Sequence, residues 1–548
     1  MLSHTQIGRF WLIASACIAL AVLAPVVTLA VHALQGTAAH WEHLLEHVLP
    51  HAMRNTLLLL LGVGVVVSLL GVGSAWLMTA YRFPTRNVLG WALLLPLAVP
   101  TYIVAFAYQD ILHPIGPVQG LIRDVLGYTS PRQFRLPDVR SLGGAIFLLG
   151  LVLYPYVYLS TRAMFATQSA SLLEAGRILG ASRRSVFFRV ALPMARPAIA
   201  VGLSLALLET LNDIGASEFL GVQTLTVSIY TTWVSRSDLA GAAQIALSML
   251  VLVVALITLE RYGRRRQGYS QNQRSRNVQP LELKGGRAIF AMCLGWLPVL
   301  LGFIAPSLYL LHASYKYLHL TGGVSPQLLA SAWSTLYIAL ITTGITLLLA
   351  LVVAWASRGA RQTKGWQRLF KLSSIGYAIP GTVLALGLLL PFVWFDNLLE
   401  NFLALFSERA PQLLLMGSSS ALVIAYCIRF LAIGIGSLES GLARIPPSVE
   451  QASRLLGESP GGTLRRVHLP LLRPAMGAAA LLIFVDTMKE LPATLLLRPM
   501  NFETLATWLY AEAARGTYEE GAIAALAIVV AGLLPIILLA KAQFSRQR

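Results

Sequence analysis

The chain has 548 residues, of which 56% are hydrophobic and only 12% are charged. A soluble domain carries about 25% charged residues, so this composition excludes an ordinary globular protein and favours one whose surface meets lipid. The formal net charge is +18. We nevertheless expect no nucleic-acid partner, because proteins embedded in a bilayer concentrate Lys and Arg in their cytoplasmic loops, and the basic residues here lie between apolar runs.

Apolar runs long enough to cross a bilayer occur along the whole chain, since a spanning helix needs about 20 mostly apolar residues. The first, Phe10–Val31, is too long for the core of a signal peptide, and we expect it to be retained. The next clear runs are Asn55–Tyr81, Asn87–Gln109, Ser141–Thr161, Leu239–Leu259, Ala288–Leu311, Trp333–Ser357, Leu372–Phe395, Ala410–Ile428 and Gly521–Ala540. Two shorter runs end at acids, Pro197–Leu208 and Pro474–Val485. With both counted, the sequence predicts an all-α membrane protein of about twelve spans.

Charged residues in the loops set the orientation of these spans. The loops on one side of a twelve-span chain hold most of the Lys and Arg, notably in the stretches 162–196 and 261–287. By the positive-inside rule this side is cytoplasmic, and both termini then lie inside. One external loop, between the third and fourth spans, departs from the rule because it contains Arg123, Arg132, Arg135 and Arg140.

Cysteine and histidine give little indication of metal chemistry. Cys17, Cys293 and Cys427 each lie in an apolar run, and we expect them to be buried and unpaired. In the first external loop, His43 and His47 are four residues apart, so a helix would place both on one face where they are candidate metal ligands. The same segment carries an apolar stripe, which favours a helix lying on the membrane surface instead.

The two halves of the chain repeat one another. After a shift of 277 residues, Gly180 falls on Gly457, Pro193 on Pro470, Glu209 on Asp486 and Asp213 on Glu490. Matches at one offset indicate a tandem duplication with six spans in each parallel copy. We expect a first domain at 1–262, a basic cytoplasmic linker at 263–285 and a second domain at 286–548.

The duplicated cytoplasmic segment has the pattern Glu-Ala-small, three residues, Gly, and then a hydrophobic-x-Leu-Pro sequence. It resembles the signature loop of binding-protein-dependent ABC importer permeases, in spacing and in its place between the fourth and fifth spans. The resemblance implies that two loops, about 168–197 and 445–474, dock on an ATPase and pass its motion to the spans. The matching residues are Glu174, Ala175, Gly176, Gly180 and Pro193 in the first loop, and Glu450, Gln451, Ala452, Gly457 and Pro470 in the second.

The resemblance also implies the partners and the location. They are a cytoplasmic ABC ATPase homodimer, a periplasmic binding protein and the lipid of the bacterial inner membrane. The chain has no Gly-Lys pair and therefore no P-loop, nor any HExxH or CxxC pattern. We therefore expect no catalytic residue and no bound cofactor, with ATP used by the partner subunit. A secondary transporter driven by an ion gradient is the alternative from another class, but it leaves the duplicated loop unexplained.

Ionisable residues recur in the outer half of both fifth spans. Such residues inside a membrane usually mark a pathway, and hard cations prefer oxygen ligands. They predict a polar route open to cations, and the alternative is a set of structural ion pairs or helix-end residues. The residues are Glu209, Asn212, Asp213, Asp486, Lys489 and Glu490. Arg429, in the tenth span, either pairs with one of these acids or lies at a snorkelling end.

Two stretches, 212–234 and 489–510, resemble the ferric-iron permeases of this superfamily, which are commonly fused two-half chains. That resemblance implies import of Fe(III) received from the binding protein. Fused thiamine permeases have a similar layout, and related systems carry polyamines or phosphonates. A route that accepts cations does not separate iron from thiamine, which is also cationic.

Overall fold

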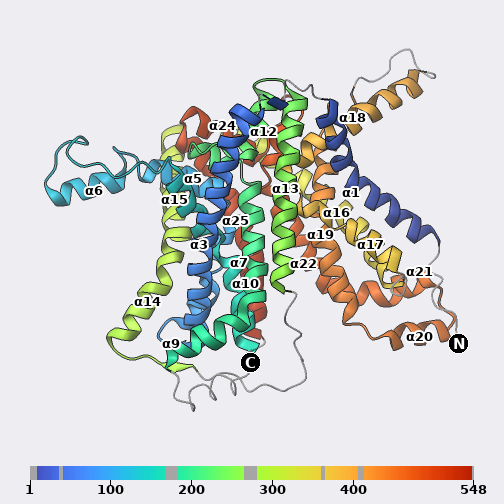
Figure 1. The fold of residues 1–548 in the computed structure, drawn as a ribbon, viewed down its shortest axis with the longest axis horizontal. Coiled ribbons are helices and arrows are strands. Elements are labelled where there is room, and N and C mark those ends of the chain that lie inside the picture. The colour runs from blue at the N-terminus through green and yellow to red at the C-terminus, as the bar shows by residue number, and fades with distance from the viewer. Residues whose placement is uncertain are drawn as a thin grey trace. The chain divides into compact units, whose positions relative to one another are not determined.

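The computed structural model describes residues 9–35, 41–42, 44–167, 182–264, 280–359, 364–404 and 413–545. Most of these residues are helical (Figure 1). By length and composition, eleven helices in the described ranges can cross a membrane, and one sharply bent helix pair raises the number to twelve. The predicted all-α fold with about twelve spans is confirmed.

The first copy is built on five long helices: α1 (Arg9–Gln35), α3 (Leu49–Ala80), α7 (Leu142–Thr167), α10 (Leu192–Asn212) and α13 (Leu239–Arg264). Shorter helices connect them: α4 (Arg86–Ala92), α5 (Thr101–Ile111), α6 (Pro117–Leu126), α9 (Arg183–Val186), α11 (Gly215–Phe219) and α12 (Leu225–Val234). Two short π-helices, η1 (Leu44–Val48) and η3 (Phe187–Ala191), and one 3₁₀ turn, η2 (Leu95–Ala98), complete the copy.

The second copy repeats this order. Its long helices are α14 (Gly286–Val299), α15 (Ala305–Thr321), α16 (Pro326–Gly359), α18 (Gly381–Ala404), α19 (Ser420–Ala443), α22 (Leu469–Met488) and α25 (Tyr518–Ser545). The shorter ones are α17 (Lys364–Leu372), α20 (Pro447–Leu455), α21 (Pro460–Thr463), α23 (Pro492–Leu497) and α24 (Leu505–Arg515). The single turns are η4 (Leu300–Ile304), η5 (Ile375–Ala378) and η6 (Leu464–His468).

A proline breaks the third span of the first copy and is repeated in the second. The helical segments on the two sides of the first break, Arg86–Ala98 and Thr101–Ile111, meet at 91°. Val99, which precedes Pro100, has φ −102° and ψ 114°, as expected because proline excludes the helical conformation from the residue before it. Ile379 before Pro380 has φ −80° and ψ 121°, so α18 starts after an equivalent break.

The acid-containing runs extend further than hydropathy predicts. The continuous helices cover Arg184–Asn212 and Pro460–Met488 and therefore include Glu209 and Asp486. The run predicted at Ala410–Ile428 is displaced to Ser420–Ala443, because the helix continues through Arg429. A charged residue ends an apolar run in the sequence, but it does not end a helix when a partner compensates its charge.

The chain folds into two compact units, and each unit combines stretches from both copies. Unit 1 comprises Met1–Glu42, Ile229–Leu247 and Val324–Trp508, and unit 2 comprises His43–Ser228, Ser248–Gly323 and Leu509–Arg548. Within unit 1, α1 packs on α16 and α18; within unit 2, α14 packs on α3 and α4, and α15 packs on α5. The first span of each copy thus packs against spans of the other copy. The predicted domain limits follow the sequence repeat and remain a prediction.

The end of the predicted linker forms a short strand. β2 (Leu281–Glu282) pairs in parallel with β1 (Tyr81–Arg82), which follows α3. The amide of Leu283 donates to the carbonyl of Arg82 at 2.8 Å. This pairing within unit 2 fixes the start of the second copy to the end of a first-copy span, and no hydropathy pattern predicts it.

Two of the expectations from sequence are wrong. Cys17 and Cys293 are exposed, and Cys427 is buried. An apolar run in a membrane protein turns part of its surface to lipid, so a place in the run does not predict burial. The segment around His47 is not a separate surface helix, because η1 continues directly into α3 as one helix from Leu44 to Ala80.

The contact of α1 with α18 depends on a glycine. A Cβ atom at Gly387 would lie 2.2 Å from the carbonyl oxygen of Pro25, whereas one at Gly344 of α16 would meet nothing within 4 Å. Thr28 of α1 also donates its hydroxyl to the Gly387 carbonyl. The two helices therefore touch backbone to backbone.

We predict that Gly387→Ala lowers the thermal stability of the purified chain, because overpacking against a backbone atom costs about 1–3 kcal/mol. The matched control Gly344→Ala leaves stability unchanged or raises it, since alanine favours a helix over glycine. The measurement is the unfolding temperature of both variants in one detergent. Equal temperatures for the two variants would contradict the packing of α1 on α18.

Candidate functional site

The predicted coupling residues are described mainly in the second copy. Glu174, Ala175, Gly176 and Gly180 lie outside the described residues, and Pro193 stands in the first turn of α10. In the second copy, the residues Glu450, Gln451 and Ala452 lie on α20 and Pro470 lies in the first turn of α22, with Gly457 between the two helices.

Gly457 closes α20. Its φ is 83°, a left-handed conformation that favours glycine. Its amide donates to the carbonyl of Arg454 at 3.0 Å, and the next amide, of Glu458, donates to that of Ser453 at 3.1 Å, the pair of bonds that defines a Schellman motif. The two residues before the glycine, Leu455 and Leu456, are 88% and 85% exposed. The helix therefore ends in an apolar tip that stands clear of the described part of the chain.

An ion-pair network ties α20 to the spans of unit 1. Arg358, at the end of α16, donates to the Glu450 carboxylate and to the carbonyls of Leu442 and Ile445, the last at 2.9 Å. His468 Nε2, at the end of η6, lies 3.3 Å from the same Glu450 oxygen. The His468 imidazole and the Arg358 guanidinium hold the pKa of Glu450 below its ordinary value, against the opposing effect of partial burial. α20 is thus connected to two spans through one carboxylate.

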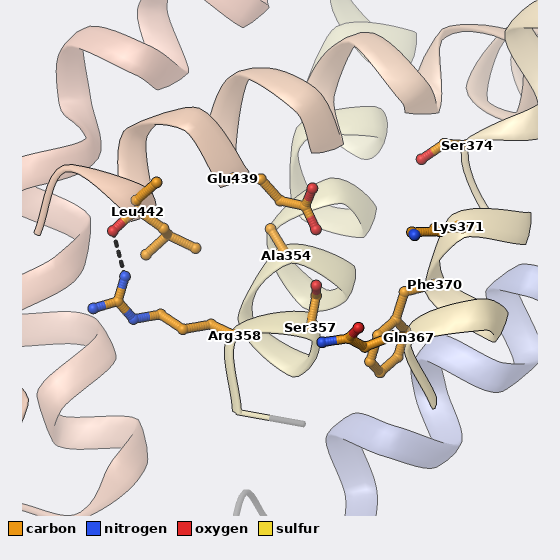
Figure 2. A pocket seen from close by; sticks show the side chains of 10 residues that line it. Ala354, Ser357, Arg358, Gln367, Phe370, Lys371, Ser374, Glu439 and Leu442 are labelled. Atoms are coloured by element: carbon orange, nitrogen blue, oxygen red, sulfur yellow. Dashed lines mark hydrogen bonds between the residues drawn. The ribbon is translucent and has the colours of Figure 1, made fainter. Parts of the chain in front are cut away.

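A cavity of about 340 Å³ lies beside this network, where the ends of α16, α17 and α19 approach one another (Figure 2). Figure 2 shows Arg358 reaching the Leu442 carbonyl at its edge. Besides Arg358, its lining includes the basic side chain of Lys371 and the acidic side chain of Glu439, so the cavity is polar. Its lining residues are Ala354, Ser357, Arg358, Gln367, Phe370, Lys371, Ser374, Glu439, Leu442 and Ala443.

The first copy lacks the members of this network. Ala75 and Trp76 align with Ala354 and Trp355, so that the position of Arg358 is taken by Thr79. The 277-residue shift places Leu173 at the position of Glu450 and Ala191 at that of His468. At these aligned positions the first copy therefore carries none of the three network residues.

In unit 1, the buried carboxylate of Glu490 lies at the end of the fifth span of the second copy, α22. Glu490 follows α22 and accepts hydrogen bonds from the amides of Ala493 at 2.9 Å and Thr494 at 3.1 Å. The Thr494 hydroxyl donates to it at 2.7 Å, and Arg429 Nη1 of α19 lies 3.8 Å away. Glu490 thus caps α23 and answers the open question about Arg429, which pairs with an acid instead of snorkelling.

In unit 2, Asp213 has the equivalent place after α10. It is buried and accepts from the amides of Ser217 at 3.0 Å and Ala216 at 3.4 Å, capping α11. It also accepts from the hydroxyl of Thr101, at 2.8 Å, in the first turn of α5. Asp213 therefore joins the break in the fifth span to the break in the third.

The two copies complete this cap with different groups. Because Pro100 aligns with Pro380, Gly381 takes the place of Thr101 in the second copy. A Cβ atom at Gly381 would lie 2.5 Å from Arg429 Nη1 and 2.8 Å from the Glu490 carboxylate. The missing side chain leaves the space that the guanidinium occupies. A hydroxyl donor in one copy is thus exchanged for a cation in the other.

The remaining predicted route residues are partly exposed. In unit 2 these are Glu209 and Asn212, and in unit 1 they are Asp486 and Lys489. Lys489 Nζ lies 2.8 Å from Asp486, as its place in the sequence suggested. The described residues contain no group of three or more His, Cys, Asp or Glu side chains that could hold a metal. His47 lies beside Glu46 at 3.9 Å, and His43 is outside the described residues.

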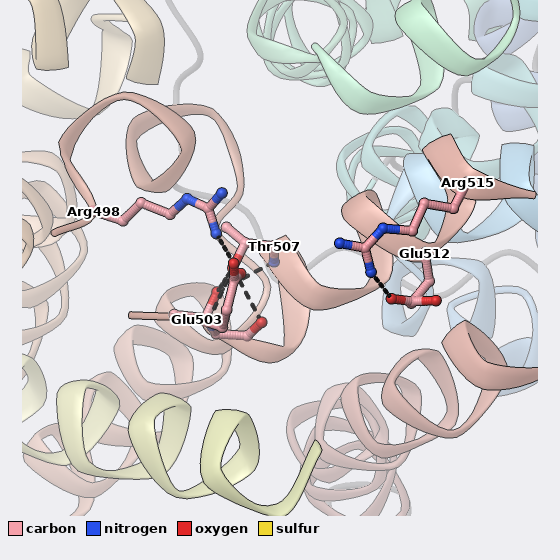
Figure 3. Close-up of polar contacts among 6 residues, drawn as sticks. Arg498, Glu503, Thr507, Glu512 and Arg515 are labelled. Atoms are coloured by element: carbon pink, nitrogen blue, oxygen red, sulfur yellow. Dashed lines mark hydrogen bonds and ion pairs between the residues drawn. The ribbon is translucent and has the colours of Figure 1, made fainter. Parts of the chain in front are cut away.

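Sequence reasoning missed two further carboxylates near α24 (Figure 3). In unit 1, Glu503 pairs with Arg498 and accepts the hydroxyl of Thr507 at 2.7 Å. In unit 2, the buried Glu512 pairs with Arg515 at 2.7 Å. The Glu512–Arg515 spacing of three residues on a helix was a signal available in the sequence.

We predict that the ion pair at the second-copy cap stabilises the chain as a unit. Glu490→Gln and Arg429→Leu should each lower thermal stability, because breaking a buried pair costs about 3–5 kcal/mol. The double variant should lose less than the sum of the two. Asp213→Asn is the matched control and should lose less than Glu490→Gln, since the Thr101 hydroxyl still donates to the amide oxygen. Strictly additive losses would contradict the pairing.

The comparisons with known proteins agree with the family resemblance. Residues 67–268 match the family model described as binding-protein-dependent transport system inner membrane component. The Fe(3+)-transport system permease protein FbpB 2 of Haemophilus influenzae is 25% identical over 522 residues, which cover 93% of each chain. The ferric transport system permease protein FbpB of Actinobacillus pleuropneumoniae is 24% identical over 508 residues, covering 88% of this chain and 70% of the relative.

A relative that matches less than half of the chain is more similar in sequence. The putative 2-aminoethylphosphonate transport system permease protein PhnU of Salmonella choleraesuis is 31% identical over 223 residues, 40% of this chain and 76% of the relative. The chain therefore belongs to the family of binding-protein-dependent transport inner membrane components, as the multi-pass, non-catalytic permease subunit of an ABC importer, a class that works with an ATPase and a binding protein.

Proposed function

We propose that this permease imports Fe(III), which a periplasmic binding protein delivers and an ATPase homodimer drives from the cytoplasmic side, where both termini lie. The observation that carries the proposal is similarity over both halves to relatives named for ferric-iron transport, over 93% of the chain in one case. The acids at the ends of α10 and α22 support it, because carboxylates are the oxygen ligands that a hard cation prefers.

We assign to the substrate route the partly exposed residues of each copy's fifth span, each taken within its own unit: Glu209 and Asn212 in unit 2, and Asp486 and Lys489 in unit 1. The buried Asp213 in unit 2 and Glu490 in unit 1 each hold the neighbouring helix end of their own unit through backbone hydrogen bonds. In unit 1, Lys489 lies 2.8 Å from Asp486 and balances its charge.

A second candidate substrate is 2-aminoethylphosphonate, for which the relative with 31% identity is named. This molecule carries both an ammonium and a phosphonate. A phosphonate would use Lys489, where a bare metal ion would use the acids. The two substrates therefore make opposite demands on the same position.

We predict that deleting the chain from iron-starved cells removes uptake of labelled Fe(III), and that restoring it restores uptake. Labelled 2-aminoethylphosphonate and labelled thiamine are measured in parallel and should not respond. If iron uptake is unchanged while one of the other two falls, the iron assignment is wrong and the responding compound is the substrate.

The route is tested in the same cells. Glu209→Gln and Asp486→Asn should each reduce iron uptake roughly tenfold, as expected when about 1.4 kcal/mol of binding is lost. Glu282→Gln, an exposed acid on β2, is the control and should leave uptake unchanged. Normal uptake in both route variants, with the chain present at normal levels, would contradict the route and leave the substrate assignment standing.

We propose that α20 is the second-copy docking helix for the ATPase. Its exposed leucine tip offers the apolar surface, and the Arg358–Glu450–His468 network passes a displacement of α20 to α16 and to the helix that contains α22. The small, exposed Ala452 leaves room for close approach of a partner. The first-copy loop would dock in the same way through Glu174, Ala175, Gly176 and Gly180.

We predict that Gly457→Ala uncouples ATP hydrolysis from transport. A left-handed alanine costs about 1–2 kcal/mol, so the helix end shifts and the tip is misplaced. The matched control is Gly461→Ala, where an added Cβ meets nothing within 4 Å, and it should behave as wild type. ATPase activity and uptake are measured together in proteoliposomes that contain the assembled transporter. Normal transport by Gly457→Ala at normal chain levels would contradict the docking assignment.

A further inference from the structure

The external loop between the third and fourth spans contains a helix that none of the functions above uses. α6 (Pro117–Leu126) follows α5, which ends at Ile111, and precedes α7, which begins at Leu142. Both neighbours belong to spans of unit 2, so α6 starts and returns at their outer ends. Figure 1 shows α6 lying across the direction of the long helices α3 and α15 of the same unit.

The apolar side of α6 faces away from the protein. Leu121 and Val125, one turn apart, are 66% and 79% exposed. Gln119 and Arg123, on the opposite side, are only 1% and 7% exposed. This is the reverse of a helix on a water-soluble surface, where the polar face is outside. Further exposed apolar side chains at the two ends of the helix extend the same surface: Ile115, Leu126 and Tyr128.

Hydrogen bonds fix this orientation. Gln119 Nε2 donates to the carbonyl of Leu112 at 2.8 Å, and its amide oxygen accepts from the backbone of Leu136 at 3.1 Å. Arg123 Nη1 donates to the carbonyl of Pro114 at 2.7 Å. Rotating the helix to hide its leucines would break these hydrogen bonds, and leaving buried polar groups unsatisfied costs about 1–3 kcal/mol each. The apolar face is therefore built to point outward.

The returning part of the loop is basic. It contributes Arg132, Arg135 and Arg140 against Asp138, while α6 itself carries Arg123 and Asp124, in a loop that departs from the positive-inside rule. Arg135 and Arg140 line an open cavity of about 240 Å³ with Gln119 and Tyr518. Tyr128 stacks on Phe134 with ring centroids 6.4 Å apart, and tyrosine is favoured at the level of lipid headgroups.

We propose that α6 lies in the outer headgroup region of the membrane, with Leu121 and Val125 at the acyl boundary and the arginines of the returning loop on the phosphates of anionic phospholipids. An interfacial helix combines an apolar face with basic residues that meet anionic lipid, and this loop has both. Its attachment to the outer ends of two spans keeps it at membrane level. A water-soluble partner would have to approach that level, so lipid is the occupant that the placement favours.

The first test labels the apolar face. Leu121→Cys and, as matched control, Leu455→Cys of the exposed α20 tip are made in a chain without native cysteines and reconstituted in nanodiscs of phosphatidylglycerol and phosphatidylcholine. A polarity-sensitive dye at position 121 should be quenched by brominated lipid and be several-fold less accessible to iodide than the dye at 455. Equal iodide access at both positions would overturn the proposal and leave this face to a water-soluble protein.

The second test keeps the native cysteines, so it remains valid if the cysteine-free chain folds poorly. The full chain should unfold at a higher temperature in nanodiscs with phosphatidylglycerol than in phosphatidylcholine alone. In the triple variant Arg132→Gln, Arg135→Gln, Arg140→Gln, that difference should shrink. A lipid-dependent shift of unchanged size in the variant would overturn the arginine–phosphate contacts.

Discussion

The broken spans depend on one constraint, which is that a chain interrupted inside a membrane must satisfy its free backbone amides without water. Asp213 and Glu490 meet this constraint by capping the short helices α11 and α23. A carboxylate suits this place because the amide ends of a helix carry partial positive charge. Asp213 also bonds Thr101 at the break in the third span, so one acid holds two interruptions in register.

Since their duplication the two copies have met this constraint in different ways. In the first copy the neutral hydroxyl of Thr101 donates to the capping acid. In the second copy Gly381 has no side chain at that position, and the charged Arg429 occupies the space and pairs with the acid. The same divergence recurs around α20, where only the second copy has the residues of the Arg358–Glu450–His468 network. The two copies therefore repeat the same helices but differ in these charged residues.

The sequence predicted the elements and their repetition better than their contacts. Span number follows from hydropathy, and the pairs Glu209–Asp486 and Asp213–Glu490 follow from one offset, because both are local or periodic signals. Hydropathy cannot tell lipid from protein as the neighbour of an apolar side chain, so Cys17 and Cys293 were wrongly expected to be buried. The Arg358–Glu450 pair joins residues far apart in the chain, and no spacing rule reaches across that distance. The two breaks at Pro100 and Pro380 were visible as matched prolines but not as bends.

The packing of α1 on α16 and α18 has a consequence for biosynthesis. α1 leaves the ribosome well before its partners, which are made hundreds of residues later. During that interval it resides in the bilayer without its permanent neighbours. Its sequence suits this wait, because between Phe10 and Leu34 it contains no Asp, Glu, Lys or Arg and only one histidine. Completion of unit 1 must then follow synthesis of the second copy, so final assembly is a late, post-insertion event.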